Sequence, residues 1–365
     1  MFNKNFVLFH KLNPKLLIAV GVIIFISGLI QLFIFSTHEE NDESYQQSFS
    51  QSYKIFALNI PKDLNFSGEK VPVENFYVRE NLDRELLVNT YFQSQTLLYI
   101  KRANRWFPVI EPILKREGVP DDFKFLALIE SGFSNVISPR GAAGFWQIMK
   151  DAGEQYGLEI NEEVDERFSI EKSTEVACRY LKDAYKLFNN WTLAAASYNM
   201  GMEGISRQVE KQKTVNYYDL NLNDETSRYI FRILVVKEIM QNPKRYGFLV
   251  RKKDLYPQIA TSFVSVDSAI ISLPDFATQH GINYKILKIL NPWLKETFLS
   301  NKKNNTYQIA IPKEESIKFL LSFDSEGEEN GSPFSYGNDS VLSHNFNDSV
   351  SASNPDTLSP AEKRD

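Results

Sequence analysis

Residues 119–130 read VPDDFKFLALIE, and this stretch predicts a buried helix that ends in an acid. Pro120 and two aspartates are typical of a helix start, and the nearly continuous apolar run that follows indicates burial on all sides. Glu130 closes that run. Burial and the negative end of the helix dipole both disfavour its carboxylate, so we expect a raised pKa, as a general acid near neutrality requires. The alternative is that Glu130 simply emerges into solvent.

A helical pattern extends through the chain on both sides of this stretch. Apolar residues recur at i, i+1, i+4 and i+5 within 171–188, and the same rhythm continues in 225–240 until Asn242-Pro243 ends it. No run of alternating strands interrupts the region. The sequence therefore predicts one mainly α domain over residues 81–250.

A smaller unit of mixed pattern is predicted over residues 255–313. FVSV (263–266) and TYQIAI (306–311) read as strands, whereas LPDFATQH (273–280) and NYKILKIL (283–290) read as short helices. The expected order is therefore β-α-α-β.

The N-terminal region predicts a membrane anchor. Residues 16–35, LLIAVGVIIFISGLIQLFIF, are uncharged and long enough to span a bilayer as one helix. Lysines precede this run and acids follow it, so the N-terminus is expected to stay cytoplasmic and the remainder to be exported. A cleaved signal peptide is the alternative, although the run is long for one and no small-x-small cleavage site follows. We expect residues 1–36 to form an uncleaved anchor.

Two further segments are predicted from composition alone. Residues 37–80 are mostly polar and are interpreted as a linker that carries the body away from the membrane. Residues 322–365 are rich in Ser, Asn, Asp, Glu and Gly, and are expected to be disordered.

The scarce residues exclude several kinds of chemistry. The formal net charge of −5 gives no reason to expect a nucleic-acid partner, and Cys178 is the only cysteine, so no disulfide forms within the chain. The four histidines all lie outside residues 39–279. The main domain therefore has no Ser-His-Asp or Cys-His machinery and no His-ligated metal, so any proton chemistry there must use carboxylates, Tyr or Lys.

Two short motifs follow Glu130. SGFSNVISPRGAAGFWQI (131–148) gathers turn formers and small residues, which let backbone or a ligand approach closely, although a packed turn would look the same. WTLAAASYNMG (191–201) ends an alanine-rich helix with Tyr198 and Asn199, which could bind a ligand or be buried structural residues.

Taken in order, Glu130-Ser131, Ser138-Pro139, GAAGFWQI and AAASYNMG resemble the soluble-type lytic murein transglycosylases, which have a goose-lysozyme-like fold. Residues 119–248 look most like the membrane-bound D-type branch of that family. The expected fold class is therefore mainly α, with a lysozyme-like helical catalytic domain and a small α+β unit.

The resemblance implies a reaction and a site. Such an enzyme cleaves the β-1,4 bond between N-acetylmuramic acid and N-acetylglucosamine and leaves 1,6-anhydromuramic acid ends, with Glu130 as acid and then base. This implied reaction needs no metal or organic cofactor, so none is expected. The expected substrate-binding residues, implied by the same resemblance, are Ser131, Ser138, Gln147, Met149, Tyr198, Asn199 and Glu225. Among these, Met149 and Tyr198 are expected to line the cleft, and Tyr198 also to hydrogen-bond near the acid. The expected partner is the glycan strand of peptidoglycan, reached from the inner membrane into the periplasm of a Gram-negative-type bacterium.

The C-terminal unit resembles a LysM module in DFATQHGINYKILKILNPWL (275–294) and TYQIAIP (306–312). LysM modules bind glycans that contain N-acetylglucosamine. The usual Gly-Asp-Thr-Leu opening is replaced here by VDSAIISL (266–273), and packing against the catalytic domain is the alternative role for the unit.

Two alternatives to the lytic activity remain open from the sequence. A lysozyme-like hydrolase on the same fold would need a second carboxylate to hold water, for which Glu225, Asp151 and Asp165 are candidates. A non-catalytic peptidoglycan-binding or scaffold protein would keep the fold without using the acid.

Overall fold

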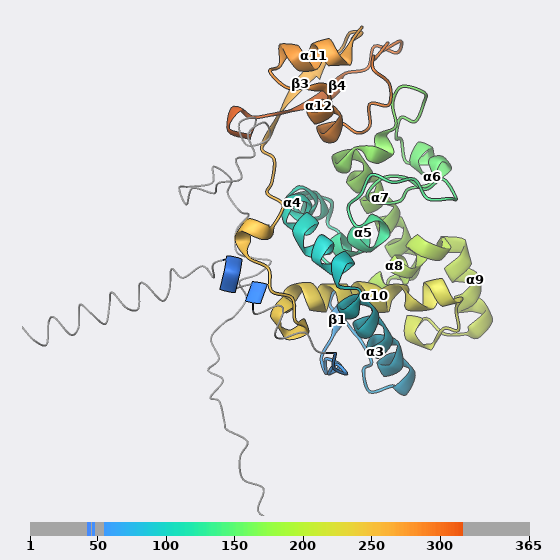
Figure 1. The fold of residues 1–365 in the computed structure, drawn as a ribbon. Coiled ribbons are helices and arrows are strands. Elements are labelled where there is room, and N and C mark those ends of the chain that lie inside the picture. Colours follow the sequence, from blue (N-terminus) through green and yellow to red (C-terminus); the bar gives the residue numbers. More distant parts are fainter. Residues whose placement is uncertain (1–41, 45, 48–54, 317–365) are drawn as a thin grey trace, which may run out of the picture. The chain divides into compact units, whose positions relative to one another are not determined.

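The structure is a computed structural model that describes residues 42–44, 46, 47 and 55–316 (Figure 1). The chain divides into two compact units, residues 1–57 and 58–365, and the elements named below all lie in the second. The anchor predicted at 16–35 and the tail predicted at 322–365 lie outside the described residues. Within the described ranges, no helix is both long enough and apolar enough to cross a membrane.

The predicted fold class is confirmed, because the described part of the chain is mainly helical. The α-helices of the main domain are α3 (Phe76–Tyr91), α4 (Gln93–Glu117), α5 (Phe123–Ser131), α6 (Lys150–Gln155), α7 (Ile170–Phe188), α8 (Trp191–Met200), α9 (Met202–Gln212) and α10 (Asp224–Gln241). Short 3-10 turns lie at η1 (Glu166–Phe168), η2 (Tyr217–Asp219), η3 (Pro243–Tyr246) and η4 (Lys252–Asp254). The helices predicted at 119–130, 171–188 and 225–240 correspond to α5, α7 and α10.

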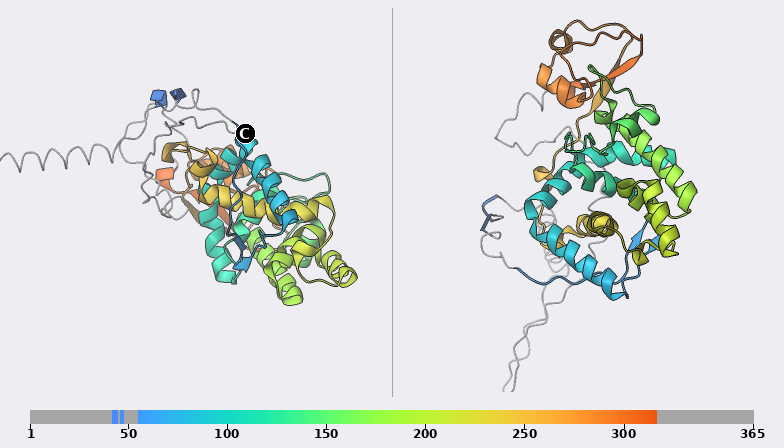
Figure 2. Two further views of the ribbon diagram at one scale, coloured as in Figure 1. Left: turned by 90° about the horizontal axis from the view of Figure 1, so that it is seen from below. Right: turned by 90° about the vertical axis from the view of Figure 1, so that its right-hand side faces the viewer.

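Helix α10 is the central element of the domain. Figure 2 shows it end-on in its right-hand view, with α3, α4, α7 and α8 arranged around it, and it packs against α3, α5 and α8. Ile230, Ile233 and Leu234 are completely or almost completely buried in its middle. Asn223 caps its start by accepting a hydrogen bond from the Thr226 amide. A helix surrounded in this way is stabilised by packing more than by its own propensity.

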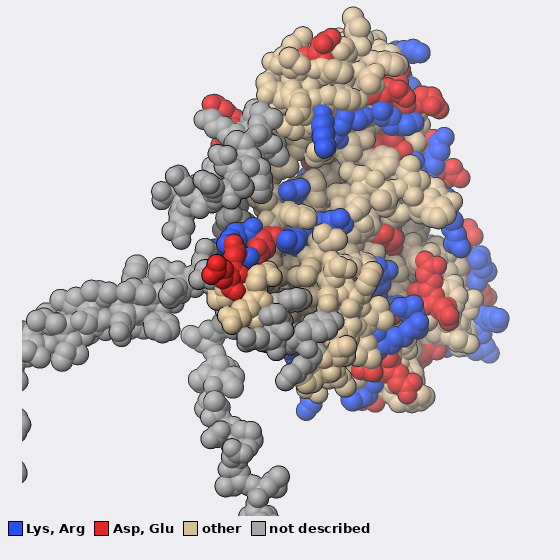
Figure 3. Space-filling view, viewed as in Figure 1, with Lys and Arg blue, Asp and Glu red and all other residues tan. Residues whose placement is uncertain are grey.

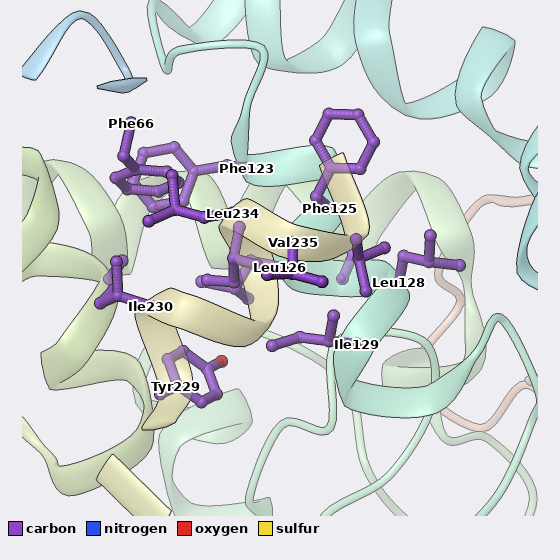
Figure 4. Close-up of a cluster of buried hydrophobic side chains, with 14 of the residues drawn as sticks. Phe66, Phe123, Phe125, Leu126, Leu128, Ile129, Tyr229, Ile230, Leu234 and Val235 are labelled. Atoms are coloured by element: carbon purple, nitrogen blue, oxygen red, sulfur yellow. The ribbon is translucent and has the colours of Figure 1, made fainter. Parts of the chain in front are cut away.

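Helix α5 is short and buried on every side, as its apolar sequence predicts. Every residue from Phe123 to Ile129 is buried, and the cluster in Figure 4 shows Leu126 and Ile129 among side chains of α10. Gly118 ends the preceding helix in a left-handed conformation, which turns the chain into the approach to α5. This core holds the last turn of α5, and therefore Glu130, in one place.

A small hairpin corrects the predicted linker over residues 37–80. Strands β1 (Asn65–Phe66) and β2 (Glu69–Lys70) pair antiparallel, and Phe66 and Val71 are completely buried in the main core. Val78 is buried as well, in α3. The prediction was wrong for this part because single apolar residues separated by polar ones give no periodic pattern, yet each occupies the core.

The hairpin forms hydrogen bonds to the starts of two helices that lie far along the chain. The Glu69 carboxylate accepts hydrogen bonds from the amides of Trp191 (2.6 Å) and Thr192 (2.9 Å), at the start of α8. The Ser67 amide donates to Asp122, just before α5, at 2.7 Å. An acid at a helix N-terminus satisfies free amides and interacts favourably with the helix dipole.

The C-terminal unit has the β-α-α-β order predicted for it. Strand β3 (Thr261–Val266) pairs antiparallel with β4 (Tyr307–Pro312), and α11 (Leu273–Gln279) and α12 (Tyr284–Leu290) lie between them in sequence. The unit has its own core, which includes Leu273, Leu287 and Ile309. Val164 of the main domain belongs to that core and is 1% exposed. The unit therefore packs against the main domain.

Candidate active site

Glu130 lies in the last turn of α5, where the chain turns sharply. Gly132 caps the helix in a left-handed conformation (φ 56°), and its amide donates to the Leu128 carbonyl at 2.8 Å. A Cβ at this glycine would lie 3.0 Å from the Tyr99 ring, so a larger residue would need that ring to move. The turn leaves the Glu130 carboxyl at the edge of the core.

The carboxyl of Glu130 faces a cleft of about 400 Å³. The cleft is lined by Glu85, Val88, Asn89, Phe92, Gln95, Thr96, Ile129, Glu130, Ser138, Gln147, Asn199, Glu225, Arg228, Tyr229 and Arg232. These residues come from α3, α4 and the junction between them, from α5, α8 and α10, and from the loop between α5 and α6. Three carboxyl groups, two guanidinium groups and several apolar side chains thus share one concave surface, which suits a polar ligand with apolar faces such as a sugar.

Burial raises the pKa of Glu130 to about 6. A hydrogen bond from Tyr229 and the positive charge of Arg232 oppose this rise, and the negative charge of Glu225 adds to it. A carboxyl with this pKa holds its proton far better near neutrality than an ordinary glutamate, as the sequence predicted from burial.

Tyr229 is the nearest partner of the acid, and the sequence analysis did not single it out. Its hydroxyl, on α10, donates a hydrogen bond to Oε1 of Glu130. Burial, followed by the charge of Glu130, raises the pKa of Tyr229 well above its ordinary value, so the phenol stays protonated. Its position in an apolar helical rhythm favoured a core role, and only the packing of α10 on α5 reveals the contact.

Tyr198 supports the site from behind. Its hydroxyl donates to the carbonyl of Trp146 at 2.8 Å, and it is not among the residues that line the cleft. Burial, followed by the charge of Glu130, raises the pKa of Tyr198, so the ring lies near the acid. The predicted position in the cleft lining is therefore corrected, because the hydroxyl is engaged by the backbone of the 141–148 loop.

Asn199 and Glu225 lie together in the cleft lining. The Asn199 amide donates to Oε1 of Glu225 at 3.0 Å, and its carbonyl oxygen accepts from the Thr226 hydroxyl at 2.6 Å. The end of α8 is thereby joined to the first turn of α10.

Ser138 and Gln147 also line the cleft, from the loop between α5 and α6. The Gln147 backbone has a positive φ of 46°, which is uncommon for a residue with a side chain. Its side-chain amide donates to the carbonyls of Gly144 (2.8 Å) and Val136 (3.2 Å), which holds this conformation.

Ser131 and Met149 do not line the cleft. The Ser131 hydroxyl donates to the Phe145 carbonyl at 2.8 Å and so ties the end of α5 to the loop that follows. Met149 stands just before α6 and is 47% exposed. The predicted place of Met149 in the lining is corrected, and roles for these two residues toward a ligand stay predictions.

Residues of α3, and Phe92 directly after it, contribute a wall that the sequence did not indicate. Glu85 is 1% exposed and pairs with Arg228 of α10 at 2.7 Å, whereas Val88 and Phe92 are 45% and 58% exposed at the same cleft. Exposed apolar side chains in a cleft suit the apolar faces of a sugar ring. Helical periodicity alone could not assign α3 to the cleft, because it does not say which helices meet.

The candidate water-holding acids occupy different places. Asp165 is buried and paired with Arg167 at 2.7 Å, and Asp151 lies in the first turn of α6; neither lines the cleft. Of the three candidates, Glu225 is the one that lines the cleft.

Within the described ranges, other kinds of chemistry have no group of side chains to support them. The described residues contain no group of three metal-ligating side chains. Burial raises the pKa of the Cys178 thiol to about 12, which makes it unreactive.

A helical domain that holds one acid of raised pKa in a sugar-sized cleft is the arrangement of a lysozyme-like, glycan-cleaving domain. Residues 107–221 match the family model described as the transglycosylase SLT domain, and residues 262–315 match the soluble lytic transglycosylase C-terminal LysM-like domain. The chain therefore contains an SLT transglycosylase domain followed by a LysM-like domain, and the resemblance recognised from the sequence is confirmed.

Two curated relatives match more than half of the chain. The chain is 28% identical over 257 residues to the membrane-bound lytic murein transglycosylase D of Escherichia coli K12, which covers 68% of this chain and 55% of the relative. The protein of the same name from Escherichia coli O6:H1 gives the same values. The chain thus spans about half the length of the curated relatives it matches.

Proposed function

We propose that this protein is a peptidoglycan lytic transglycosylase and that Glu130 is its catalytic acid and base. The observation that carries the proposal is the partly buried carboxyl of Glu130, with a pKa raised to about 6, in the cleft of an SLT domain. At pH 7 such a group is still about one tenth protonated, which is enough to supply a general acid.

The reaction needs only this one carboxyl group. Protonated Glu130 gives its proton to the glycosidic oxygen between N-acetylmuramic acid and N-acetylglucosamine, and the bond from that oxygen to muramyl C1 breaks. The substrate's own acetamido group can stabilise the positive charge that develops at C1. The Glu130 carboxylate then takes the proton from the muramyl C6 hydroxyl, whose oxygen attacks C1 and closes the 1,6-anhydro ring. No water is consumed, and the enzyme returns to its protonated state.

Neighbouring residues are proposed to prepare Glu130 and to hold the glycan. The hydrogen bond from Tyr229 orients the carboxyl, and Arg232 stabilises the carboxylate between the two steps. Ser138, Gln147, Asn199 and Glu225 would contact the substrate, since all four line the cleft. Ser131 and Tyr198 would act by bracing the loop that carries Gln147.

Hydrolysis is the second candidate, and one observation favours it. Glu225 lies in the same cleft as Glu130, so a second carboxylate is present that could hold a water. Its side chain is already engaged by Asn199, which favours a structural or substrate-binding role.

The cellular setting is a further part of the proposal. The apolar run at 16–35 would anchor the chain in the inner membrane as a single span, with the catalytic domain in the periplasm. The curated relatives carry "membrane-bound" in their names, which supports this assignment. The proposed catalytic domain starts near residue 58, because the hairpin belongs to its core, and the LysM-like unit over 255–313 would bind N-acetylglucosamine-containing glycan.

The test is a digest of purified peptidoglycan sacculi with the full chain, with Glu130→Gln as the matched control. Products are separated and weighed. Fragments that end in 1,6-anhydromuramic acid, absent with the variant, would support the proposal. Reducing ends that are heavier by one water would establish hydrolysis, and sacculi that bind the protein but stay intact would leave a binding protein.

A further inference from the structure

We propose that the LysM-like unit is a structural support of the cleft, and that Arg167 is the positioning residue through which it acts. Only the effect expected on catalysis depends on the proposed function; the structural support itself does not. It concerns the loop of residues 136–148, which supplies Ser138 and Gln147 to the cleft.

The first step is the attachment of one main-domain segment, residues 159–168, to the C-terminal unit. The Asp165 amide donates to the Trp293 carbonyl at 2.9 Å, and Val164 forms a β-bridge with Leu294. Val164 also fills the core of the unit. The segment is therefore part of the C-terminal unit as much as of the main domain.

Acidic side chains of the same segment extend this attachment. The Glu163 carboxylate accepts two hydrogen bonds from Ser300, one from its amide and one from its hydroxyl, each 2.6 Å long. Glu159 accepts from the Tyr307 hydroxyl at 2.9 Å and from Asn305 at 3.1 Å. A free tether would need none of these contacts, which together restrict the segment to one position.

The second step is the contact between this segment and the cleft loop. Arg167 is 7% exposed, and its guanidinium forms two hydrogen bonds with the Asp165 carboxylate, at 2.7 and 2.9 Å. Its remaining nitrogen donates to the Gly141 carbonyl at 2.8 Å and to the Ile148 carbonyl at 3.3 Å. One buried side chain thus holds both ends of the GAAGFWQI stretch.

The backbone of Arg167 also touches this loop directly. A Cβ on Gly144 would lie 2.0 Å from the Arg167 carbonyl oxygen, so the two backbones are packed against each other. Gln147, whose positive φ needs support, follows three residues later and donates to the Gly144 carbonyl. The contacts therefore run without a gap from Trp293 of the LysM-like unit, through Asp165 and Arg167, to Gln147 in the cleft.

The experiment compares two variants of the full chain with the wild type. Arg167→Lys keeps the charge but cannot form the same forked set of hydrogen bonds, and Glu163→Ala removes the two bonds to Ser300 without touching the loop. Glu162→Ala, at an exposed neighbour in the same segment, is the matched control. Amide hydrogen exchange of peptides that cover 136–148 is the first readout, because it needs no activity.

Both variants are expected to exchange faster over 136–148, while the exchange of α10 stays close to wild type. On sacculi, kcat is expected to fall about 10- to 100-fold with little change in KM, because misplacing positioned groups harms the transition state more than binding.

Unchanged exchange and an unchanged kcat in both variants would overturn the proposal. If the wild type itself releases no anhydro products, the proposed function fails, and the exchange data alone decide whether the support exists. If Arg167→Lys does not fold, Glu163→Ala alone tests the proposal, because it weakens the attachment of the segment to the LysM-like unit.

Discussion

The hydroxyl of Tyr229 donates a hydrogen bond to Oε1 of Glu130 and joins the central helix α10 to the end of α5. The two residues are 99 positions apart in the sequence. The bond holds the pKa of Glu130 down, against the burial that raises it to about 6. The protonation state of the proposed catalytic acid therefore depends on how two buried helices pack.

Removing this bond should raise the pKa of Glu130 further. In Tyr229→Phe the carboxylate loses a donor, and a hydrogen bond to a charged group of about 1.5 kcal/mol corresponds to about one pKa unit. The alkaline limb of the pH–kcat/KM profile should therefore move to higher pH. Tyr246→Phe removes a similar Tyr-to-Glu bond outside the cleft, to Glu238, and should leave the profile unchanged. An unmoved or acid-shifted limb in Tyr229→Phe would contradict this role.

Glu130→Gln should abolish the reaction and stabilise the fold above about pH 6. The folded carboxyl keeps its proton up to about pH 6, whereas an unfolded glutamate releases it near 4.5. The folded state therefore binds more protons between these values, and stability falls as pH rises through the window, by about 2 kcal/mol in all.

Denaturant titration checks this prediction at two pH values. The variant should be more stable than wild type by about 1–2 kcal/mol near pH 8 and equal to it near pH 4, because both side chains are then neutral. Glu162→Gln, at an exposed acid, should show no such pH-dependent difference. A stability gain that is the same at both pH values would argue against a buried charge as its cause.

Substitution of Gly144 should be far more harmful than substitution of Gly141 in the same loop. Both have a positive φ, 76° and 86°, so alanine is strained at either position by about 1–2 kcal/mol. Only at Gly144 would the new Cβ also meet backbone, 2.0 Å from the Arg167 carbonyl oxygen; at Gly141 nothing lies within 4 Å. We expect Gly144→Ala to lose at least about 3 kcal/mol of stability and most of its activity. Equal melting temperatures for the two variants would show that the loop can move away.

The N-terminal hairpin should prove necessary for stability. Glu69→Ala leaves the amides of Trp191 and Thr192 without their carboxylate, and we expect a loss of about 2–3 kcal/mol from the lost cap and the unsatisfied donors. Lys70→Ala, at an exposed position of the same strand, is the control and should cost under about 0.5 kcal/mol. Thermal unfolding of the two variants makes the comparison, and equal losses would remove the capping role from Glu69.

Several features followed from local sequence. Helices α5, α7 and α10, and the β-α-α-β order of the C-terminal unit, lie where apolar periodicity and breakers such as Pro243 predict them. The raised pKa of Glu130 also followed, because an apolar run that is buried in the core partly buries the charged residue at its end. On the face seen in Figure 3, basic and acidic side chains are interspersed, in keeping with the mixed charges along the chain.

Other features had no local signal. The hairpin around Phe66 looked like a linker, because its few apolar residues have no period. Their role in the core is seen only from the packing of Phe66 on Phe123, whose ring centroids are 5.2 Å apart. Glu85 on α3 is likewise part of the cleft only because α3 and α10 are neighbours.

The sequence by itself determined the helical class and the order of elements, since these depend on residues close together in the chain. It also led to the proposal of Glu130 as the acid, through the resemblance of its motifs to a known family. Tertiary structure alone decided that Tyr229, rather than Tyr198, bonds Glu130, and that Arg167 bonds both the Gly141 carbonyl of the cleft loop and the Asp165 carboxylate. Hydrogen bonds between distant residues depend on the distance and direction that packing imposes, and a one-dimensional pattern contains neither.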